Sequence, residues 1–284
     1  MLGKQHLIVT IVFLFAYLSI IIFSYFNTAK ITSISSFFVI LFSVIKTQYI
    51  FLLLFSVGVI ISSTAPDIDM TSNTEGFFIW NKITRLGYLV LTAFMKPFAN
   101  KDTFEHRHLY HSVFGIIIYA AIIFLIFFFA GFIFLAITLL LSHQAIGLEL
   151  FALTFNKLMV YKTYLYIFII GCAVGFMSHL LEDTITVTGI NYFPGISKYR
   201  LAGRFITCGK HGYRKRDTGE LVYVPFFKRT GFAAILLSIY TFIFIGTFFY
   251  FNIYLSGWLY SSILFLVGYL IYSTIFCGLK IKKW

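Results

Sequence analysis

The residues best suited to chemistry are histidines and aspartates at the ends of long apolar runs. His179 and Asp183 stand four positions apart at the end of one run, so a helix would place both side chains on one face. His6 directly precedes the first run, and His106 and His111 stand at the start of another. Imidazole nitrogen together with carboxylate oxygen suits a divalent metal, zinc first, with manganese or iron as alternatives. The spacing therefore predicts a metal site.

Two further acids and an arginine belong to the same pattern. Asp67 and Asp69 follow Pro66 after the second apolar run. They either bind metal or cap a following helix, and Asp69 is also a candidate general base. Arg107 is a candidate for holding a substrate phosphate, because a guanidinium fork matches phosphate oxygens. The predicted metal ligands are His6, Asp67, His106, His111, His179 and Asp183, and the predicted catalytic residues are Asp69 and Arg107.

Several polar residues have a plainer interpretation. His6 alone is readily explained as a polar cap of the first run, and Glu182 is expected either beside the ligands or in solvent. His143 and Glu149 form either a relay or a packed polar pair. Arg204 is a second phosphate candidate, with contact to lipid headgroups as the favoured alternative.

The elements that position these residues are membrane spans. Hydrophobic residues make up 60% of the 284-residue chain and charged residues only 11%, against about 25% charged in soluble domains. A span needs about 20 apolar residues, and the longest uncharged or nearly uncharged runs lie at residues 7–26, 31–64, 112–155, 163–181, 231–251 and 255–278. We predict an all-α polytopic protein with about six to seven transmembrane helices. A cleaved signal peptide at the first run is disfavoured by its length and by Asn27 near its end.

Two segments between the spans differ from the rest. The stretch Phe77–Phe98 has loose helical periodicity broken by basic residues, which favours an amphipathic helix in the interface over a helix packed under the bundle. The segment Thr184–Arg229 is basic and rich in glycine, so we expect loops and short strands. We divide the chain into a metal-site membrane domain, residues 1–230, and a C-terminal hairpin, residues 231–284.

The net charge of +12 favours a membrane surface over a nucleic acid. Basic residues gather between the spans, as cytoplasmic loops do, and each attracts anionic lipid by about 1 kcal/mol. We therefore expect a multi-pass protein of the plasma (cytoplasmic) membrane with membrane lipids as partners and no nucleic acid. The three cysteines are far apart, so neither a thiolate zinc ribbon nor a disulfide framework is expected.

The motifs and their order resemble the YdjM-like family of predicted membrane-bound metal-dependent hydrolases. That family has an N-terminal His, an L-P-D-I-D motif, an H-R-G-x-T-H-S motif and an H-x-x-x-D-x-x-T-x-x-G motif. The matching segments here are His6, 65–69 (APDID), 106–112 (HRHLYHS) and 179–189 (HLLEDTITVTG). His108 and Tyr110 depart from the family pattern, while the ligand candidates are kept. The resemblance runs from Met1 to about Arg204, with a looser similarity to zinc-dependent phospholipase C.

One site requires that all its ligands lie on one side of the membrane. His111 and His179 must therefore be separated by an even number of crossings, yet three apolar stretches lie between them. Residues 132–155 are the expected exception, because polar residues interrupt them.

The resemblance and the residues together imply a membrane-embedded metal-dependent hydrolase. Its expected substrate is a phosphoester or lipid-like molecule at the cytoplasmic interface. The alternatives are a metal-binding transporter, which would be expected to show repeat symmetry, and a non-enzymatic membrane scaffold.

Overall fold

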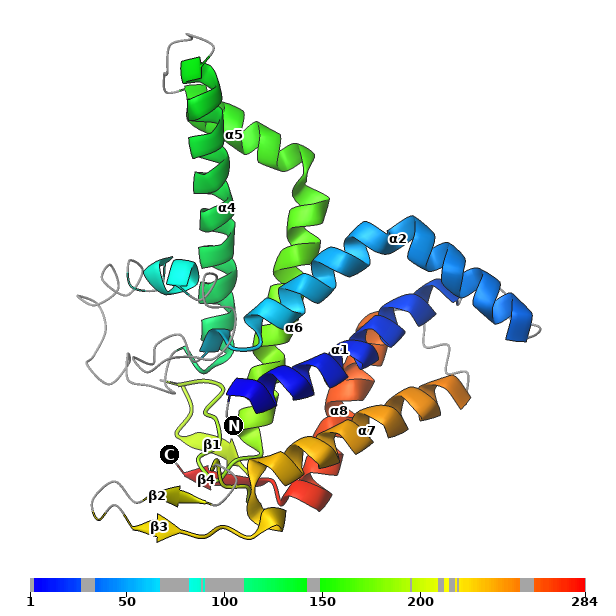
Figure 1. Cartoon of the computed structure of the whole chain (residues 1–284), viewed down its shortest axis with the longest axis vertical. Coiled ribbons are helices and arrows are strands. Elements are labelled where there is room, and N and C mark those ends of the chain that lie inside the picture. Colours follow the sequence, from blue (N-terminus) through cyan, green and yellow to red (C-terminus); the bar gives the residue numbers. More distant parts are fainter. Residues whose placement is uncertain are drawn as a thin grey trace.

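The computed structural model is a bundle of helices with a small strand-bearing region at one end (Figure 1). It describes residues 3–26, 34–66, 82–87, 89, 110–141, 149–194, 196–208, 212–214, 218, 220–250 and 258–283. The long helices are α1 (Gly3–Phe26), α2 (Ile34–Ser62), α4 (Val113–Leu141), α6 (Lys162–Thr184), α7 (Thr230–Tyr250) and α8 (Trp258–Cys277). The shorter α5 is Glu149–Val160.

Five of these helices, α2, α4, α6, α7 and α8, are long and apolar enough to cross a membrane. Helix α1 adds a shorter apolar segment, His6–Ile22. The predicted all-α membrane fold is confirmed. The helices α7 and α8 lie close to the predicted C-terminal hairpin, residues 231–284. Of the predicted interfacial helix, residues 82–87 are helical, and the rest lies almost wholly outside the described residues.

Helix α6 is the most buried of the five spans, and it crosses α2 backbone against backbone. A Cβ atom at Gly171 would lie 2.4 Å from the Phe55 carbonyl oxygen, and one at Gly175 would lie 2.1 Å from that of Val59. On α2, Gly58 faces the α6 backbone just as closely. The Gly171-x-x-x-Gly175 spacing is the small-residue pattern that brings membrane helices together.

The closing helices α7 and α8 share a core with α1. Buried residues of all three, including Phe13, Leu237, Phe265 and Tyr269, form one hydrophobic cluster. The hydroxyl of Tyr269 donates a hydrogen bond to the Leu181 carbonyl near the end of α6. The closing hairpin is therefore packed into the same body as the first helix.

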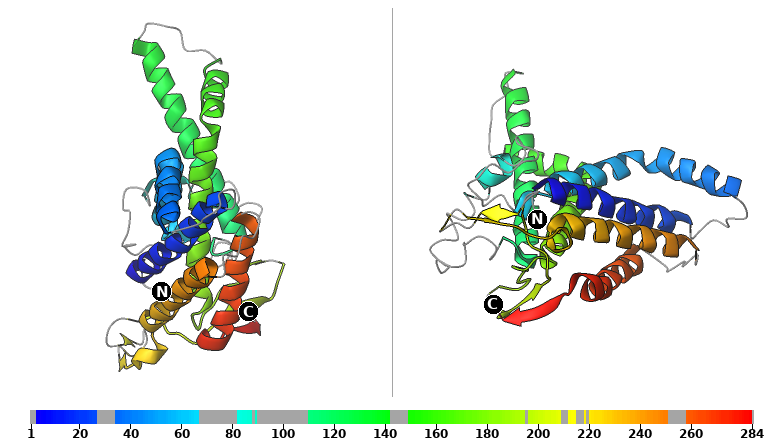
Figure 2. Two further views of the ribbon diagram at one scale, coloured as in Figure 1. Left: turned by 90° about the vertical axis from the view of Figure 1, so that its right-hand side faces the viewer. Right: turned by 60° about the horizontal axis from the view of Figure 1, so that its bottom comes forward.

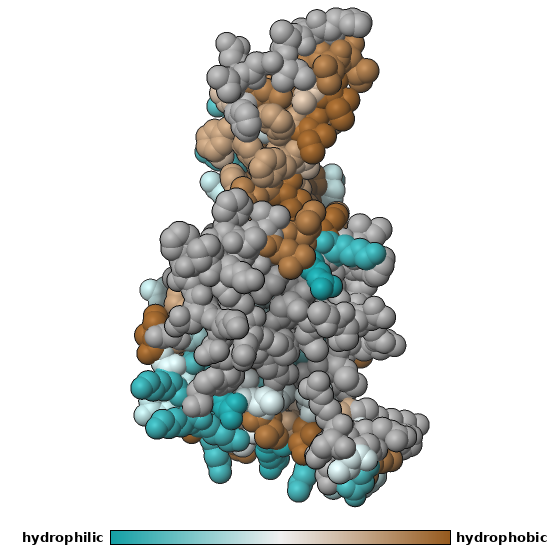
Figure 3. Space-filling view, turned by 90° about the vertical axis from the view of Figure 1, so that its left-hand side faces the viewer, coloured by the Kyte–Doolittle hydropathy of each residue, from teal (hydrophilic) through white to brown (hydrophobic). Residues whose placement is uncertain are grey.

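The basic segment holds three short strands, as predicted. They are β1 (Tyr199–Ala202), β2 (Tyr213–Arg214) and β3 (Leu221–Val222), followed by the 3-10 turn η4 (Phe226–Lys228). The partner of β1 was not predicted: it is β4 (Lys280–Lys283), the C-terminal tail, in antiparallel register. Figure 2 shows the tail returning to the strand-bearing end, and Figure 3 shows hydrophilic side chains gathered there.

Candidate metal centre

Four helix ends meet around a small group of buried polar side chains. The start of α1 contributes His6, and the last turns of α6 contribute His179 and Asp183. His111 precedes the first residue of α4, and Ser63 follows the last residue of α2. His6, His111, His179 and Asp183 are all at most 1% exposed, so ionisable groups are concentrated where the spans begin and end.

Three of these residues form a possible ligand set. One ligand atom each from His6, His179 and Asp183 lies within 4.8 Å of the others. Nε2 of His6 is 3.5 Å from Oδ1 of Asp183, and Nε2 of His179 is 3.8 Å from Oδ2. Two imidazole nitrogens therefore converge on one carboxylate.

The Nδ1 atom of each histidine makes a hydrogen bond that orients the ring, so that Nε2 is directed at Asp183. Nδ1 of His179 lies 2.7 Å from the Ser63 carbonyl oxygen. A carbonyl only accepts hydrogen bonds, so Nδ1 carries the proton and the neutral ring offers the Nε2 lone pair. Nδ1 of His6 likewise lies 2.7 Å from Oε2 of Glu182, whose Oε1 accepts a 3.0 Å bond from the Thr10 hydroxyl. Carbonyl and carboxylate partners of this kind orient histidines that bind metals.

The charges of the group also suit a cation. Glu182 and Asp183 are buried carboxylates, and a buried negative charge requires compensation. The rings of His6 and His179 stack at 3.8 Å and 16°, which disfavours a positive charge on both because like charges repel at that distance. A bound cation would compensate the carboxylates while leaving both imidazoles neutral, so the donor set fits a divalent metal.

His111 lies beside this group without being one of the three. Its ring centroid is 5.7 Å from that of His179, in an edge-to-face arrangement. The structure therefore brings together four of the six predicted ligands. Asp67, Asp69, His106 and Arg107 lie outside the described residues, as does His143.

The structure adds residues that the sequence analysis did not assign. Thr10 and Ser63 orient the site through their hydrogen bonds, and only Thr10 carries a signal, being four positions after His6 on one helix. Glu182 was expected either beside the ligands or in solvent. The structure shows the first alternative, because Glu182 is fully buried and its carboxylate contacts His6.

The residues after Asp183 end helix α6. The Thr186 hydroxyl donates to the Asp183 carbonyl oxygen at 2.7 Å and accepts from the Gly189 amide at 3.3 Å. Gly189 has φ of +64°, and a Cβ there would lie 2.1 Å from the Leu201 carbonyl oxygen. This motif therefore has two parts. His179 and Asp183 are the ligand candidates, and Thr186 and Gly189 form the turn that allows β1 to pack against the chain at Gly189.

A tyrosine outside the spans also borders the ligands. Tyr192 places its hydroxyl 2.5 Å from that of Thr184. Burial raises the pKa of Tyr192; the hydrogen bond with Thr184 lowers the pKa by less, and the nearby Asp183 carboxylate raises it by a still smaller amount. The phenol therefore stays protonated and is a hydrogen-bond donor beside the site.

Arg204 caps the end of α8. Its guanidinium donates a 2.7 Å hydrogen bond to the Phe276 carbonyl oxygen. Its amide also donates to the Cys277 carbonyl oxygen. This is a favourable position for a cation, and the side chain is exposed, so the expected phosphate or headgroup contact stays a prediction.

The YdjM inner membrane protein family model matches residues 1–277. The chain belongs to this family. The match extends past Arg204, where the motif resemblance ended, and includes the closing hairpin, in keeping with the core that α7 and α8 share with α1. Comparisons with curated proteins and with solved structures gave no match.

Proposed function

We propose that this YdjM-family protein is a membrane-embedded, metal-dependent hydrolase acting on a phosphoester or lipid-like substrate at the cytoplasmic interface. The observation that carries the proposal is the convergence of the His6 and His179 Nε2 atoms on Asp183, with both Nδ1 atoms held by acceptors. Such an arrangement would suit a bound cation, and ionisable groups are unusual in a span that needs only to be apolar.

The described residues divide into holding and orienting roles. His6, His179 and Asp183 would hold a divalent metal, zinc first, with His111 close enough to join after a small movement. Glu182 and Ser63 fix the two rings, and Thr10 fixes Glu182. A bound metal of this class polarises a phosphoryl or acyl oxygen and supplies hydroxide near neutral pH.

The remaining predicted residues complete the proposal from the sequence. Asp67 and His106 would be further ligands, Asp69 a ligand or general base, and Arg107 a contact for substrate phosphate. Ser63 lies at the centre, with its carbonyl oxygen on Nδ1 of His179, and the next two residues, Thr64 and Ala65, are buried.

The helix order supports a site on one side of the membrane. Between His111 and His179 the structure has two long apolar helices, α4 and α6. Helix α5 has 12 residues, about 18 Å at 1.5 Å per residue, too short for a core of about 30 Å. Among the described residues, the stretch 132–155 that was expected not to cross is divided between the end of α4 and the start of α5. Two crossings, by α4 and α6, would place His111 and His179 on the same side of the membrane.

The test is metal content followed by hydrolysis. Purified wild type should hold a transition metal in stoichiometric amount under metal-replete conditions, and Asp183→Asn should hold little. The matched control is Glu220→Gln, an exposed carboxylate, which should retain metal. Wild type without metal would overturn the proposal. Metal retained without hydrolysis of phospholipids or other phosphoesters would favour the transporter or scaffold alternative.

A further inference from the structure

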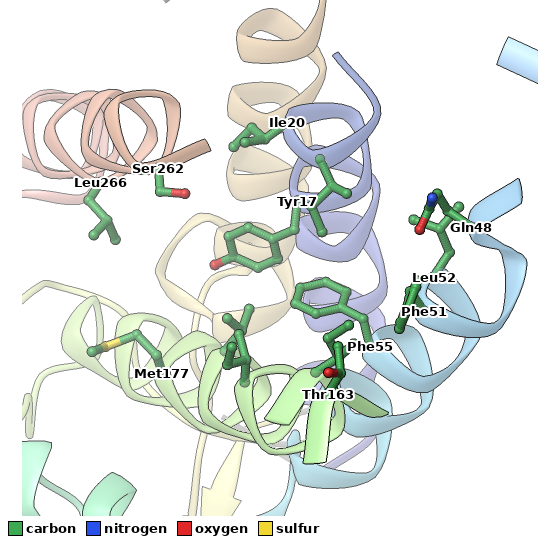
Figure 4. A pocket seen from close by; sticks show the side chains of 14 residues that line it. Tyr17, Ile20, Gln48, Phe51, Leu52, Phe55, Thr163, Met177, Ser262 and Leu266 are labelled. Atoms are coloured by element: carbon green, nitrogen blue, oxygen red, sulfur yellow. The ribbon is translucent and has the colours of Figure 1, made fainter. Parts of the chain in front are cut away.

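An apolar cavity of about 540 Å³ lies between α1, α2, α6 and α8 (Figure 4). Its walls are mainly aliphatic and aromatic, with Tyr17, Gln48, Thr163 and Ser262 as the polar exceptions. The volume falls within the range of small-molecule sites, about 300–1,000 Å³. Water would find few partners along such walls, so the natural content is hydrocarbon.

The cavity extends along α6 and ends near the level of the candidate metal centre. On α6 it is lined from Thr163 to Met177, a stretch of about 21 Å at 1.5 Å per residue. Met177 is two positions before His179, which is about 3 Å along the helix axis. At this end the Tyr17 hydroxyl lies 3.4 Å from the hydroxyl of Ser178, the residue next to His179.

The walls of the cavity select the occupant. They are apolar along most of the length, and a single extended hydrocarbon chain is narrow enough to lie along them. The bilayer around the spans supplies such chains. The polar end of the chain would then lie beside the Tyr17 and Ser178 hydroxyls, at the level of His179 along the α6 axis.

We propose that this cavity binds one acyl chain of a lipid, with the ester or phosphoester end beside the Tyr17 and Ser178 hydroxyls, at the level of His179. The binding of the acyl chain is inferred from the cavity alone. The role of the cavity as the recognition site of a long-chain substrate rests on the proposed hydrolase function. This role narrows the substrate class from phosphoesters in general to esters that carry a long acyl chain.

The binding test uses a phospholipid with a photoactivatable diazirine on its acyl chain, incorporated with the full-length protein into vesicles of unlabelled phospholipid. After irradiation, peptide mass spectrometry should place the label on the cavity-lining parts of α2 and α6. Tryptophans introduced from opposite walls, Val174→Trp and Ser262→Trp, should reduce that labelling roughly tenfold, the factor expected for displacing about two methylene groups. The control is Ile243→Trp on α7, where the native side chain is 56% exposed.

Two further measurements separate this proposal from the hydrolase proposal. All three variants should retain the wild-type metal content, which shows that the centre is still assembled. Val174→Trp and Ser262→Trp should lose hydrolysis of long-chain esters while keeping that of short, water-soluble ones. That result identifies the chain as substrate, whereas lost labelling with no change in hydrolysis identifies a bound bilayer lipid and overturns the substrate assignment.

Labelling spread evenly over the exposed helix faces, and unchanged in both cavity variants, would overturn the acyl-chain site while leaving the hydrolase proposal untouched. Cavity labelling in a protein that holds no metal would leave the acyl-chain site standing and overturn the hydrolase.

Discussion

Helix α6 has two halves with different surroundings. In the half before Gly171, Tyr164, Tyr166 and Ile170 are exposed on the helix surface, as expected of a span facing lipid. In the half after it, every residue from Ser178 to Thr184 is buried, including one histidine and two acids. Mean hydropathy qualifies the whole helix as a span and does not distinguish the two. The difference arises from what packs around each half of the helix.

The largest effect should come from removing a ligand in the buried half. His179→Ala should lower metal affinity by more than about 100-fold, beyond the 10–100-fold typical of residues that only orient ligands. Metal-competition titration of the purified protein measures it. Ser178→Ala, one position away and also buried, should keep the metal. Equal loss in both variants would mean that any polar deletion here disrupts the helix end.

Removing an orienting group should have a smaller effect on the same titration. Glu182→Gln keeps the shape of the side chain but removes the charge that would make His6 a better ligand, so metal affinity should fall about 10–100-fold. Thr10→Val removes one hydrogen bond to Glu182 and should lower it less. Wild-type affinity in Glu182→Gln would mean that His6 is not a ligand.

The α2–α6 crossing separates the two halves, and a single methyl group tests it. Gly175→Ala places a Cβ 2.1 Å from the Val59 carbonyl oxygen, and overpacking of this kind costs about 1–3 kcal/mol. Thermal unfolding in detergent should show the loss. Gly246→Ala on α7 meets no atom within 4 Å and should be neutral or stabilise the helix by up to about 1 kcal/mol. Similar unfolding of both variants would contradict the close crossing.

The smallest effect is expected in the exposed half. Tyr166 is 52% exposed, so Tyr166→Leu should change the stability by no more than about 0.5 kcal/mol and leave metal binding unchanged. Unfolding and metal titration on the same preparation check both expectations. A clear loss of metal would show that the two halves are coupled more closely than their surroundings indicate.

The sequence predicted what depends on local spacing and overall composition. Long apolar runs identified the spans, and the four-residue spacing of His179 and Asp183 was enough to place both on one face. The sequence could not predict the contacts of Glu182 with His6 and of His179 with the Ser63 carbonyl, because these contacts join helices that are distant in the chain. The pairing of β1 with β4 escaped prediction for the same reason: the lysines of the tail resemble an ordinary cytoplasmic flank of the last span.

The pairing of β1 with β4 sets an order on folding. Strand β1 precedes α7 and α8 in the chain, and its neighbour β4 follows them. The helix ends that carry His6, His179 and Asp183 are synthesised before α7 and α8, and domains fold from the N-terminus as they are made. Strand β1 therefore meets its partner only after both helices of the closing hairpin have been synthesised.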